Sequence, residues 1–497
     1  MASPDLQKRR AGVLLHPTSL PSGELDGDVD RWLQMMADTG FSVWQVLPLG
    51  EPHDGLSPYQ CTSAFAFNPL LLSDIRAIEE SEKGYHDFCE KQQYWLDDYA
   101  LFKVLKQKFE DKSWIDWPEL WRKRDSKTLQ KSSEEHADEI TALKWQQYQL
   151  HDRWHEIRDK AAGMDILLFG DMPIFIAYDS ADVWAHPEWF VLDEDGRMTV
   201  VTGVPPDYFS ETGQRWGNPH YDWGSMREDG FSWWKSRIIH HLELFDLVRI
   251  DHFRGMVSAW VIDAACETAI DGHWQNTPGD ELLTLFHESI EECGGQLPFV
   301  AEDLGIITPE VTALRKKYHL PGMSILQFGF DAFEDNPHKP HNITEDTVVY
   351  TGTHDNDTTK GWFNSLDEDM KNHVLRTLNL PTADEFETEY LNTGEPVEGH
   401  NDIDRASCWY DNIDIADVVV ERMIDNAMHS HAIICMIPLQ DCLHLGSEAR
   451  MNMPGTIDGN WRWQFQWSQI ELAHDSARMK KMRLRNEHTQ RFIEPVS

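Results

Sequence analysis

The chain has 497 residues, of which 41% are hydrophobic and 26% charged, so it can bury a large core, and disorder is excluded as its main state. Its 85 acidic residues outweigh 44 basic ones and give a formal net charge of −41. A field of that sign repels nucleic acid and anionic membrane surfaces, so we expect neither as a partner. The excess of acid predicts a highly solvated surface, and it suggests adaptation to a salty cytoplasm, where screening relieves self-repulsion.

The cysteines and the N-terminal region favour a soluble, cytoplasmic protein. Seven cysteines are widely spaced and form no CxxC pair, which indicates free thiols in a reducing compartment rather than a disulfide framework. The apolar stretch Val13–Leu15 is too short for the core of a signal peptide. No apolar run is long enough to span a membrane.

Eight short apolar runs, several of them followed by helical periodicity, predict an α/β protein built as a (β/α)₈ barrel. The predicted strands are Val13–Leu15, Val43–Leu47, Ile166–Phe169, Leu247–Ile250, Phe299–Ala301, Ser324–Phe328, Val348–Thr351 and Ala432–Ile437. We expect residues 1–497 to form a single catalytic domain. Only about sixty residues follow the last strand, too few for a C-terminal β-sandwich of usual size.

Three segments are too long for simple connections and are predicted to be insertions. Residues from about 77 to 161 are rich in Lys, Glu, Gln and Leu and predict helices. Residues from about 178 to 230 carry much Pro, Gly, Trp and Asp and predict an irregular binding loop. Residues from about 364 to 404 are strongly acidic and predict an exposed insertion of helix and loop.

Three carboxylates directly follow predicted strands: Asp251 in LVRIDHFRG, Glu302 in FVAEDLG and Asp355 in VVYTGTHDND. They are 51 and 53 residues apart. A barrel assembles its active site at the C-terminal ends of its strands, so these acids should converge. Converging carboxylates are what chemistry on a glycosidic bond requires, and the chain is predicted to be a carbohydrate-active enzyme.

The residues around the first two acids suggest distinct roles. Side chains alternate along a strand, so Arg249 and Asp251 point to the same side, and the arginine favours an ionised, oriented carboxylate suited to a nucleophile. Partial burial of Glu302 should raise its pKa, as a general acid needs. Asp303 should point elsewhere and act as a structural hydrogen-bonding group.

Further candidates for sugar binding lie near the same rim. His354 and Asp355 could hydrogen-bond two neighbouring sugar hydroxyls, and Asp171 follows the third strand in FGDMPIFI. Tyr59, in a Ser-Pro-Tyr turn, could stack on a pyranose ring. The 21 tryptophans also suit sugar binding, although most of them are expected in the core.

Other chemistries lack their motifs. The chain has no GxGxxG after a strand, no GxxxxGK[ST] and no GxSxG elbow. His151, His155 and Glu156 are in the wrong order for a zinc-binding HExxH helix. We therefore predict no cofactor and no metal.

Longer motifs resemble those of the amylomaltases, the 4-α-glucanotransferases of glycoside hydrolase family 77. The resemblance rests on RAGVLLHPTSLPSG, WQVLPLGEP, VTGVPPDYFSETGQRWGNPHYDW, RIDHFRGM, AEDLG, THDNDT, EARMNMPGT and GNWRW. These motifs occur in the family's order from about residue 9 to residue 467. GVPPDYFSETGQRWGNP is highly specific, whereas the short acidic motifs are shared more loosely with α-amylases.

The resemblance implies a (β/α)₈ barrel without the α-amylases' C-terminal β-domain, and a retaining double displacement. Asp251 then matches the nucleophile, Glu302 the acid/base, and Asp355 the carboxylate that stabilises the transition state. Further residues match positions that line the subsite of bond cleavage: Tyr59, Asp171, Arg249 and His354. The substrates implied are α-1,4-glucans and maltooligosaccharides, and no cofactor is needed because one glycosidic bond replaces another.

The resemblance also implies a lid in the segment after Arg254, and here the chain departs from the family pattern. Relatives commonly carry a Trp–x–x–Pro run in this segment, whereas this chain reads Trp260-Val261-Ile262-Asp263. Trp260 is retained as a substrate-binding candidate. The departure leaves an α-1,4-glucan hydrolase on the same scaffold as the alternative to a transferase. A non-catalytic glucan-binding protein is a remoter alternative, because such a protein would not need the three acids.

Overall fold

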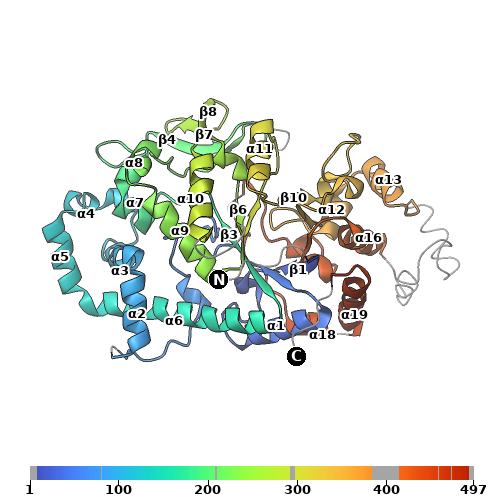
Figure 1. The fold of residues 1–497 in the computed structure, drawn as a ribbon, viewed down its shortest axis with the longest axis horizontal. Coiled ribbons are helices and arrows are strands. Elements are labelled where there is room, and N and C mark those ends of the chain that lie inside the picture. Colours follow the sequence, from blue (N-terminus) through green and yellow to red (C-terminus); the bar gives the residue numbers. More distant parts are fainter. Residues whose placement is uncertain are drawn as a thin grey trace.

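A barrel of eight parallel strands forms the centre of the molecule in the computed structural model (Figure 1). The structure describes residues 8–79, 81–206, 210–291, 297–382, 414–456, 458–471 and 473–491. The barrel strands are β1 (Arg10–Leu14), β2 (Val43–Gln45), β3 (Leu167–Met172), β6 (Leu247–Ile250), β9 (Phe299–Ala301), β10 (Gly322–Ile325), β11 (Thr347–Tyr350) and β12 (Ile434–Pro438).

The strands follow the order β10-β11-β12-β1-β2-β3-β6-β9, and every pair along it is parallel. The remaining gap lies between β9 and β10, where the Ala301 N–H donates to the Pro321 carbonyl at 2.9 Å. The Met323 N–H donates to the Asp303 carboxylate at 2.8 Å, which is the structural role expected for Asp303. These bonds bring the two edges together, so the sheet forms the predicted (β/α)₈ barrel.

The barrel interior is filled by alternate residues of its strands, as the two-residue period of a strand requires. This inner cluster comprises Val43, Phe169, Leu247, Val300, Met323, Ile325, Val348, Tyr350, Ile434 and Met436. Their neighbours face outward, and a second, larger core lies between the barrel and the helices. Gly12 faces the crowded interior, where an added Cβ would lie 2.4 Å from the Val43 carbonyl oxygen.

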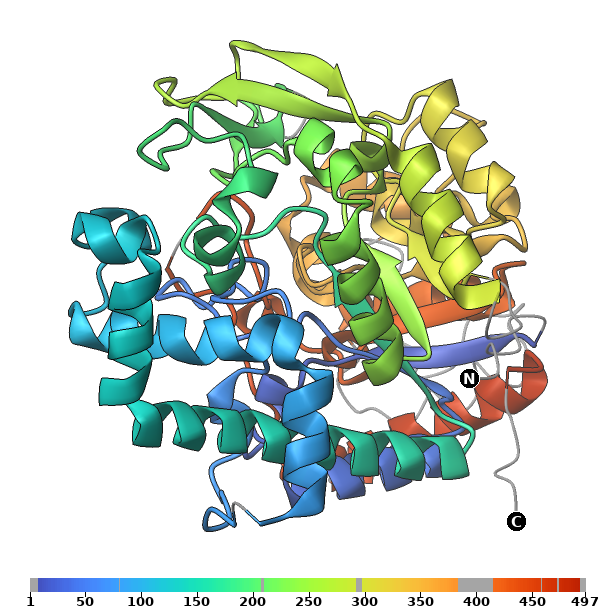
Figure 2. The same ribbon diagram turned by 60° about the vertical axis from the view of Figure 1, so that its left-hand side comes forward.

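Helices surround the barrel on the outside (Figures 1 and 2). These are α1 (Gly27–Thr39), α9 (Ser232–Leu244), α10 (Gly279–Glu291), α11 (Pro309–Lys317), α12 (Thr359–Ser365), α13 (Glu368–Thr377), α16 (Ile415–His429), α17 (Leu439–Cys442), α18 (Trp467–Glu471) and α19 (Ala473–His488). Local sequence sets their ends: the Asp26 carboxylate caps α1 by accepting from the Asp28 N–H, and Gly40, at φ 78°, ends it.

The segment expected to be a helical insertion contains α2 (Lys83–Lys91), α3 (Gln93–Lys108), α4 (Glu119–Arg122), α5 (Ser126–Glu135) and α6 (Ala137–Gly163). Helix α6 runs along the lower edge of the molecule in Figure 2. Of the predicted acidic insertion, the structure describes the end of α12 and α13, and residues 383–413 lie outside the described residues.

The segment expected to be irregular contains regular structure: α7 (Ala181–Ala185), β4 (Val200–Val204), β5 (Gln214–Arg215) and α8 (Trp223–Glu228). Strand β4 pairs antiparallel with β7 (Ser258–Asp263), which forms a hairpin with β8 (Gly272–Asn276). The resulting sheet has the order β5-β4-β7-β8 and lies above the barrel, at the top of Figure 1. Strand β4 pairs with the two-residue strand β5 nearby, but its longer partner β7 lies more than fifty residues away, so its own segment gave little sign of the sheet.

All eight predicted barrel strands are present, and two of them, β6 and β9, have the predicted bounds. The prediction Ser324–Phe328 is displaced, because β10 starts at Gly322 and ends at Ile325. Residues Leu326–Phe328 instead form a 3-10 turn. The apolar run continues into that turn because Leu326 is buried, so hydrophobicity alone did not mark the end of the strand.

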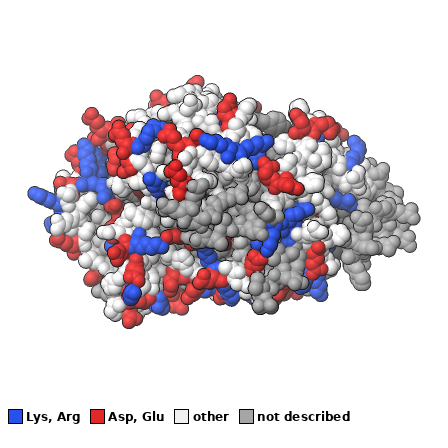
Figure 3. All heavy atoms as spheres, in the orientation of Figure 1, with Lys and Arg blue, Asp and Glu red and all other residues white. Residues whose placement is uncertain are grey.

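The surface carries the negative charge diffusely. On the face shown in Figure 3, acidic side chains are spread over the molecule with basic ones between them. Among the described residues, no helix is long and apolar enough to cross a membrane. The cysteines in the same part of the chain, Cys61, Cys89, Cys266, Cys435 and Cys442, are free thiols.

Candidate active site

The backbone places Asp251 and Glu302 side by side at the C-terminal ends of β6 and β9. The Glu302 N–H donates to the Ile250 carbonyl and the Phe253 N–H to the Glu302 carbonyl, both at 3.0 Å. The ladder of the two strands therefore continues past their ends. His252, between them, adopts a left-handed conformation at φ 51°, which turns the chain away after Asp251.

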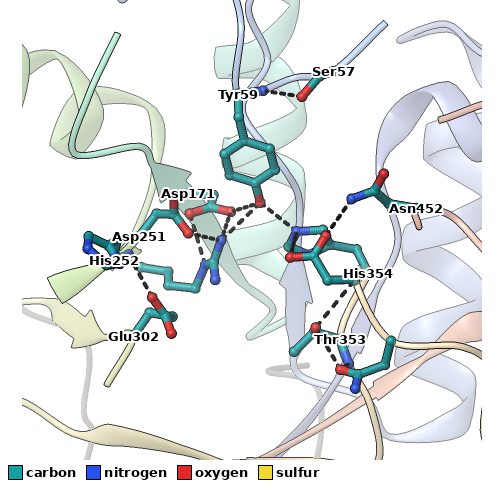
Figure 4. A network of polar contacts seen from close by, with 12 residues as sticks. Ser57, Tyr59, Asp171, Asp251, His252, Glu302, Thr353, His354 and Asn452 are labelled. Atoms are coloured by element: carbon teal, nitrogen blue, oxygen red, sulfur yellow. Dashed lines mark hydrogen bonds and ion pairs between the residues drawn. The ribbon is translucent and has the colours of Figure 1, made fainter. Parts of the chain in front are cut away.

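Two backbone N–H groups hold the Glu302 carboxyl. Oε2 accepts from the His252 N–H at 2.7 Å, and Oε1 accepts from the Leu304 N–H at 3.1 Å. The left-handed turn at His252 thus orients the second acid as well as redirecting the chain after the first. Figure 4 shows Glu302 directed toward the His252 backbone, beside Asp251.

Arg249 lies at the centre of the polar network. It is opposite Asp171 in the pairing of β6 with β3, and its Nε and Nη2 donate to the two oxygens of Asp171 at 3.0 and 2.7 Å. Nη2 also donates to Asp251 Oδ1 at 2.9 Å. The guanidinium is fully buried among carboxylates, so it fixes both acids and offsets part of their charge.

Burial raises the pKa of both catalytic candidates. Desolvation is the larger cause for Asp251, whose pKa rises to about 7 although Arg249 opposes the rise. Desolvation and then repulsion from Asp251 raise the pKa of Glu302 to about 8. Arg249 therefore has the expected effect on Asp251, but burial outweighs it. Because Glu302 holds its proton more tightly, a neutral Glu302 beside an ionised Asp251 is the favoured arrangement of a single proton.

Tyr59 connects Arg249 to His354. The phenol donates to Asp171 Oδ2 at 2.7 Å and accepts from Arg249 Nη2 at 2.9 Å. Its oxygen also lies 2.9 Å from His354 Nε2. Since the phenolic proton is directed at Asp171, the contact requires a proton on His354 Nε2. Burial lowers the pKa of His354, which gives a neutral imidazole protonated on that nitrogen.

Asp355 approaches the network from β11. Its Oδ1 accepts from the Asn452 side chain at 2.6 Å, and its Oδ2 lies 3.5 Å from His354 Nε2. Arg450 donates to the Asp355 carbonyl at 2.9 Å. The Asp355 side chain is 49% exposed, against 28% for Asp251, so it is the more open of these two acids to solvent.

Aromatic rings enclose the same region. The rings of Tyr59 and His354 stack with centroids 5.4 Å apart, and the Trp461 ring lies 6.0 Å from Tyr59 and 5.8 Å from His354. Trp461 and Asn452 belong to the motifs GNWRW and EARMNMPGT, to which sequence reasoning gave no role. Their distance along the chain from the three acids hid their place in the site.

A buried carboxylate fixes both ends of the segment that carries His354 and Asp355. Asp441, in α17, accepts from the Thr351 hydroxyl at 2.6 Å. It also accepts from the N–H and the hydroxyl of Thr359 at 2.7 and 2.6 Å. Asp441 is 1% exposed, so these bonds form away from water. The Asp441 side chain therefore holds both ends of the segment, Thr351 and Thr359, in place.

The structure brings together seven of the eight predicted site residues: Tyr59, Asp171, Arg249, Asp251, Glu302, His354 and Asp355 (Figure 4). Trp260 lies elsewhere, in β7 of the small sheet. Its indole donates to the Ala269 carbonyl at 3.0 Å and packs on the cluster of Val201 and Ile262. The residue is partly exposed, so substrate binding by Trp260 stays a prediction.

Comparison with known proteins gives one consistent result. The profile of the 4-alpha-glucanotransferase family matches residues 14–78 and 74–469. The 4-alpha-glucanotransferase of Thermus thermophilus is 41% identical, with 95% of this chain and 98% of that protein covered. The 4-alpha-glucanotransferase of Synechocystis is 38% identical over 94% of this chain and 95% of that protein.

Solved structures agree with the sequence comparison. The amylomaltase from Streptococcus agalactiae in complex with acarbose superposes with a TM-score of 0.85 at 28% identity, covering 98% of this chain and all of that one. The amylomaltase from Corynebacterium glutamicum, at 16% identity and a TM-score of 0.74, shares the fold. With the barrel and its acidic site, these matches show that the chain belongs to glycoside hydrolase family 77, the 4-alpha-glucanotransferases.

Proposed function

We propose that this 4-alpha-glucanotransferase moves α-1,4-glucan segments by a retaining double displacement on Asp251 and Glu302. The observation that carries the proposal is the acid pair itself. Two carboxyls follow adjacent parallel strands, and their environments order their pKa values so that one proton resides on Glu302. A charged nucleophile beside a neutral acid is the starting state of a retaining mechanism.

In the first half-reaction, Asp251 attacks C1 of the donor glucan while Glu302 protonates the departing 4-oxygen. Arg249 holds the attacking carboxylate, and the two backbone N–H groups on Glu302 fix the direction of its proton. As Asp251 gives up its negative charge to the new ester bond, repulsion on Glu302 falls and its proton leaves more readily. Asp355 faces the sugar with an open carboxylate and stabilises the positive charge that develops at C1.

In the second half-reaction, Glu302 takes the proton from the 4-hydroxyl of an acceptor sugar, which attacks C1 and regenerates Asp251. Bonds of one kind are broken and made, so the reaction is nearly isoenergetic and consumes no cofactor. Water that reaches the intermediate gives hydrolysis instead. The Tyr59, His354 and Trp461 rings cover part of the site and favour a sugar over water.

The test is incubation with pure maltotriose, with the products resolved by length over time. Transfer predicts products longer than three units, accumulating glucose and a constant number of reducing ends. Shorter products with rising reducing ends would identify a hydrolase. No conversion, with longer donors and molar salt also tried, would contradict enzymatic turnover.

The assignment of the nucleophile predicts that Asp251→Ala lowers kcat by at least about 10³-fold while the protein stays folded, because no other side chain can form the covalent intermediate. Asp38→Ala, an exposed aspartate of α1, is the matched control and should retain full activity. In Glu302→Gln, an activated donor such as α-maltosyl fluoride should leave a maltosyl group on Asp251, visible by mass spectrometry. A variant at Asp251 with a tenth of the normal rate would exclude this role.

A further inference from the structure

An exposed tryptophan stands on the hairpin β7–β8 beside the proposed catalytic acids. The hairpin is inserted between β6 and α10, so it rises from the C-terminal face of the barrel, where the acids lie. Trp274, in β8, is 37% exposed, and every residue of that strand is exposed. Single exposed apolar side chains are common on protein surfaces, so Trp274 is distinguished by its contacts and by its place on this hairpin rather than by its exposure.

The indole of Trp274 is held firmly in place. It lies opposite Trp260 in the hairpin, with ring centroids 5.2 Å apart in an edge-to-face arrangement. The Arg254 guanidinium carbon lies 3.9 Å from the centroid of the Trp274 ring. Arg254 also donates to the Ile306 carbonyl at 2.6 Å. Trp260 and Arg254 thus fix the ring from two sides and leave part of it open to solvent.

These contacts bridge the two segments that leave the catalytic acids. Arg254 comes three residues after Asp251, and Ile306, which is 64% exposed, comes four residues after Glu302. The surface formed by Arg254, Trp274 and Ile306 is therefore built on the segments that directly follow Asp251 and Glu302, whereas Tyr59 and His354 come from other segments. An acid/base lies on the side of the leaving and incoming glucan, because it exchanges protons with their 4-oxygens.

We propose that Arg254, Trp274 and Ile306 form a glucan-binding surface for sugar units of the acceptor chain beyond the one that reacts. The C–H face of a glucose unit packs on the indole, and the guanidinium, with donors to spare, hydrogen-bonds the hydroxyls at the edge of the ring. The surface selects longer acceptors over glucose. This inference rests on the proposed function, since it assigns the surface to the acceptor of that reaction.

The test compares glucose with maltohexaose as acceptor, for Trp274→Ala, Trp274→Phe and the wild type. The readout is the ratio of kcat/KM for the two acceptors, measured with a labelled donor. Loss of one stacking contact of about 1 kcal/mol should lower the preference for maltohexaose about fivefold in Trp274→Ala. Trp274→Phe should keep most of it. Leu120→Ala, an exposed apolar residue of α4, is the control and should not change the ratio.

A second readout separates this proposal from the proposed function. In an Asp251→Ala background, binding of maltohexaose is titrated directly, without turnover, and adding Trp274→Ala should weaken it about fivefold. An unchanged ratio and unchanged binding would overturn the proposal, as would an equal loss with both acceptors. A shift from dimer to monomer in Trp274→Ala, with acceptor preference intact, would assign the surface to a second copy of this chain. If the wild type transferred nothing but the titration still responded, the proposed function alone would fail.

Discussion

At the scale of single residues, Asp251 and Glu302 share one proton under conditions where ordinary carboxyls have lost theirs. The proposed mechanism requires Asp251 to be ionised and Glu302 to be protonated. We therefore expect a bell-shaped dependence of kcat/KM on pH. The acid limb follows protonation of Asp251, and the alkaline limb follows loss of the Glu302 proton, whose pKa is raised to about 8. Initial rates between pH 4 and 10 at constant ionic strength measure both limbs. A rate still rising through pH 10 would contradict a protonated Glu302 in the free enzyme.

The same shift makes Glu302 a source of instability. The folded-state pKa lies above the ordinary value of 4.5, so the folded protein binds more protons than the unfolded chain between those pH values. The resulting loss in the free energy of unfolding is absent below about pH 4.5, grows as pH rises and is complete above the folded-state pKa. Glu302→Gln should remove this pH dependence, although its amide offers one acceptor where the carboxyl offers two to the backbone N–H groups. The stability of the variant relative to the wild type should therefore rise by on the order of 2 kcal/mol between pH 4 and pH 9. Thermal unfolding of both proteins at the two pH values checks this, and an equal difference in Tm at pH 4 and pH 9 would refute it.

At the scale of elements, the segment from Thr351 to Thr359 is positioned by Asp441. Asp441→Ala removes three short hydrogen bonds and leaves two threonines without their acceptor. We expect the segment to shift, and with it Asp355, so that kcat falls about 10- to 100-fold while KM changes little. Thr351→Val and Thr359→Val each remove a single hydrogen bond. They should give smaller decreases in kcat, with KM little changed, and the proteins should remain folded.

The control for Asp441 is Asp246→Asn, at the opposite face of the barrel. Asp246 precedes β6 and accepts from the Leu168 N–H at 2.9 Å, so its loss should lower stability without changing kcat. If the Asp441 and threonine variants likewise lost only stability, Asp441 would have a structural role and no part in positioning Asp355.

The barrel strands could be predicted from sequence because each is buried on both faces and reads as a continuous apolar run. Boundaries were less certain where apolar residues continued past the strand, as at Leu326. The small sheet escaped prediction because its central pairing joins β4 to β7, more than fifty residues away, and the pairing of distant segments leaves no local periodicity.

The acids of the site could likewise be predicted, since each directly follows a strand. The hydrogen bonds that connect these acids to their neighbours could not be predicted. Sequence placed Arg249 beside Asp251, but the guanidinium donates two hydrogen bonds to Asp171 on the neighbouring strand and only one to Asp251. Trp260 packs by its indole within the small sheet, and its contact with substrate stays a prediction. A motif names a side chain, whereas only the fold decides which way it points.

At the scale of the whole molecule, the net charge of −41 opposes compaction. Because the acidic residues are dispersed over the face shown in Figure 3 rather than gathered in one patch, screening should relieve repulsion across that face. We expect Tm to rise by several degrees between 50 mM and 1 M NaCl. Choline chloride at the same concentrations tests whether the gain needs a particular cation. A flat Tm across this range would show that the charge does not limit stability.

Strand β1 pairs with β12 on one side, and β12 comes more than four hundred residues later in the chain. The buried Arg491 joins them further, donating to the carbonyls of Arg10 at 2.8 Å and Ile433 at 3.3 Å. During synthesis one edge of the first strand therefore stays unpaired until more than four hundred further residues have emerged from the ribosome. Its pairing has the longest sequence separation in the sheet and should be a late, slow event in folding. The barrel cannot close before β12 is made, and a chain released before β12 has an open sheet in which the edges of β1 and β11 are unpaired.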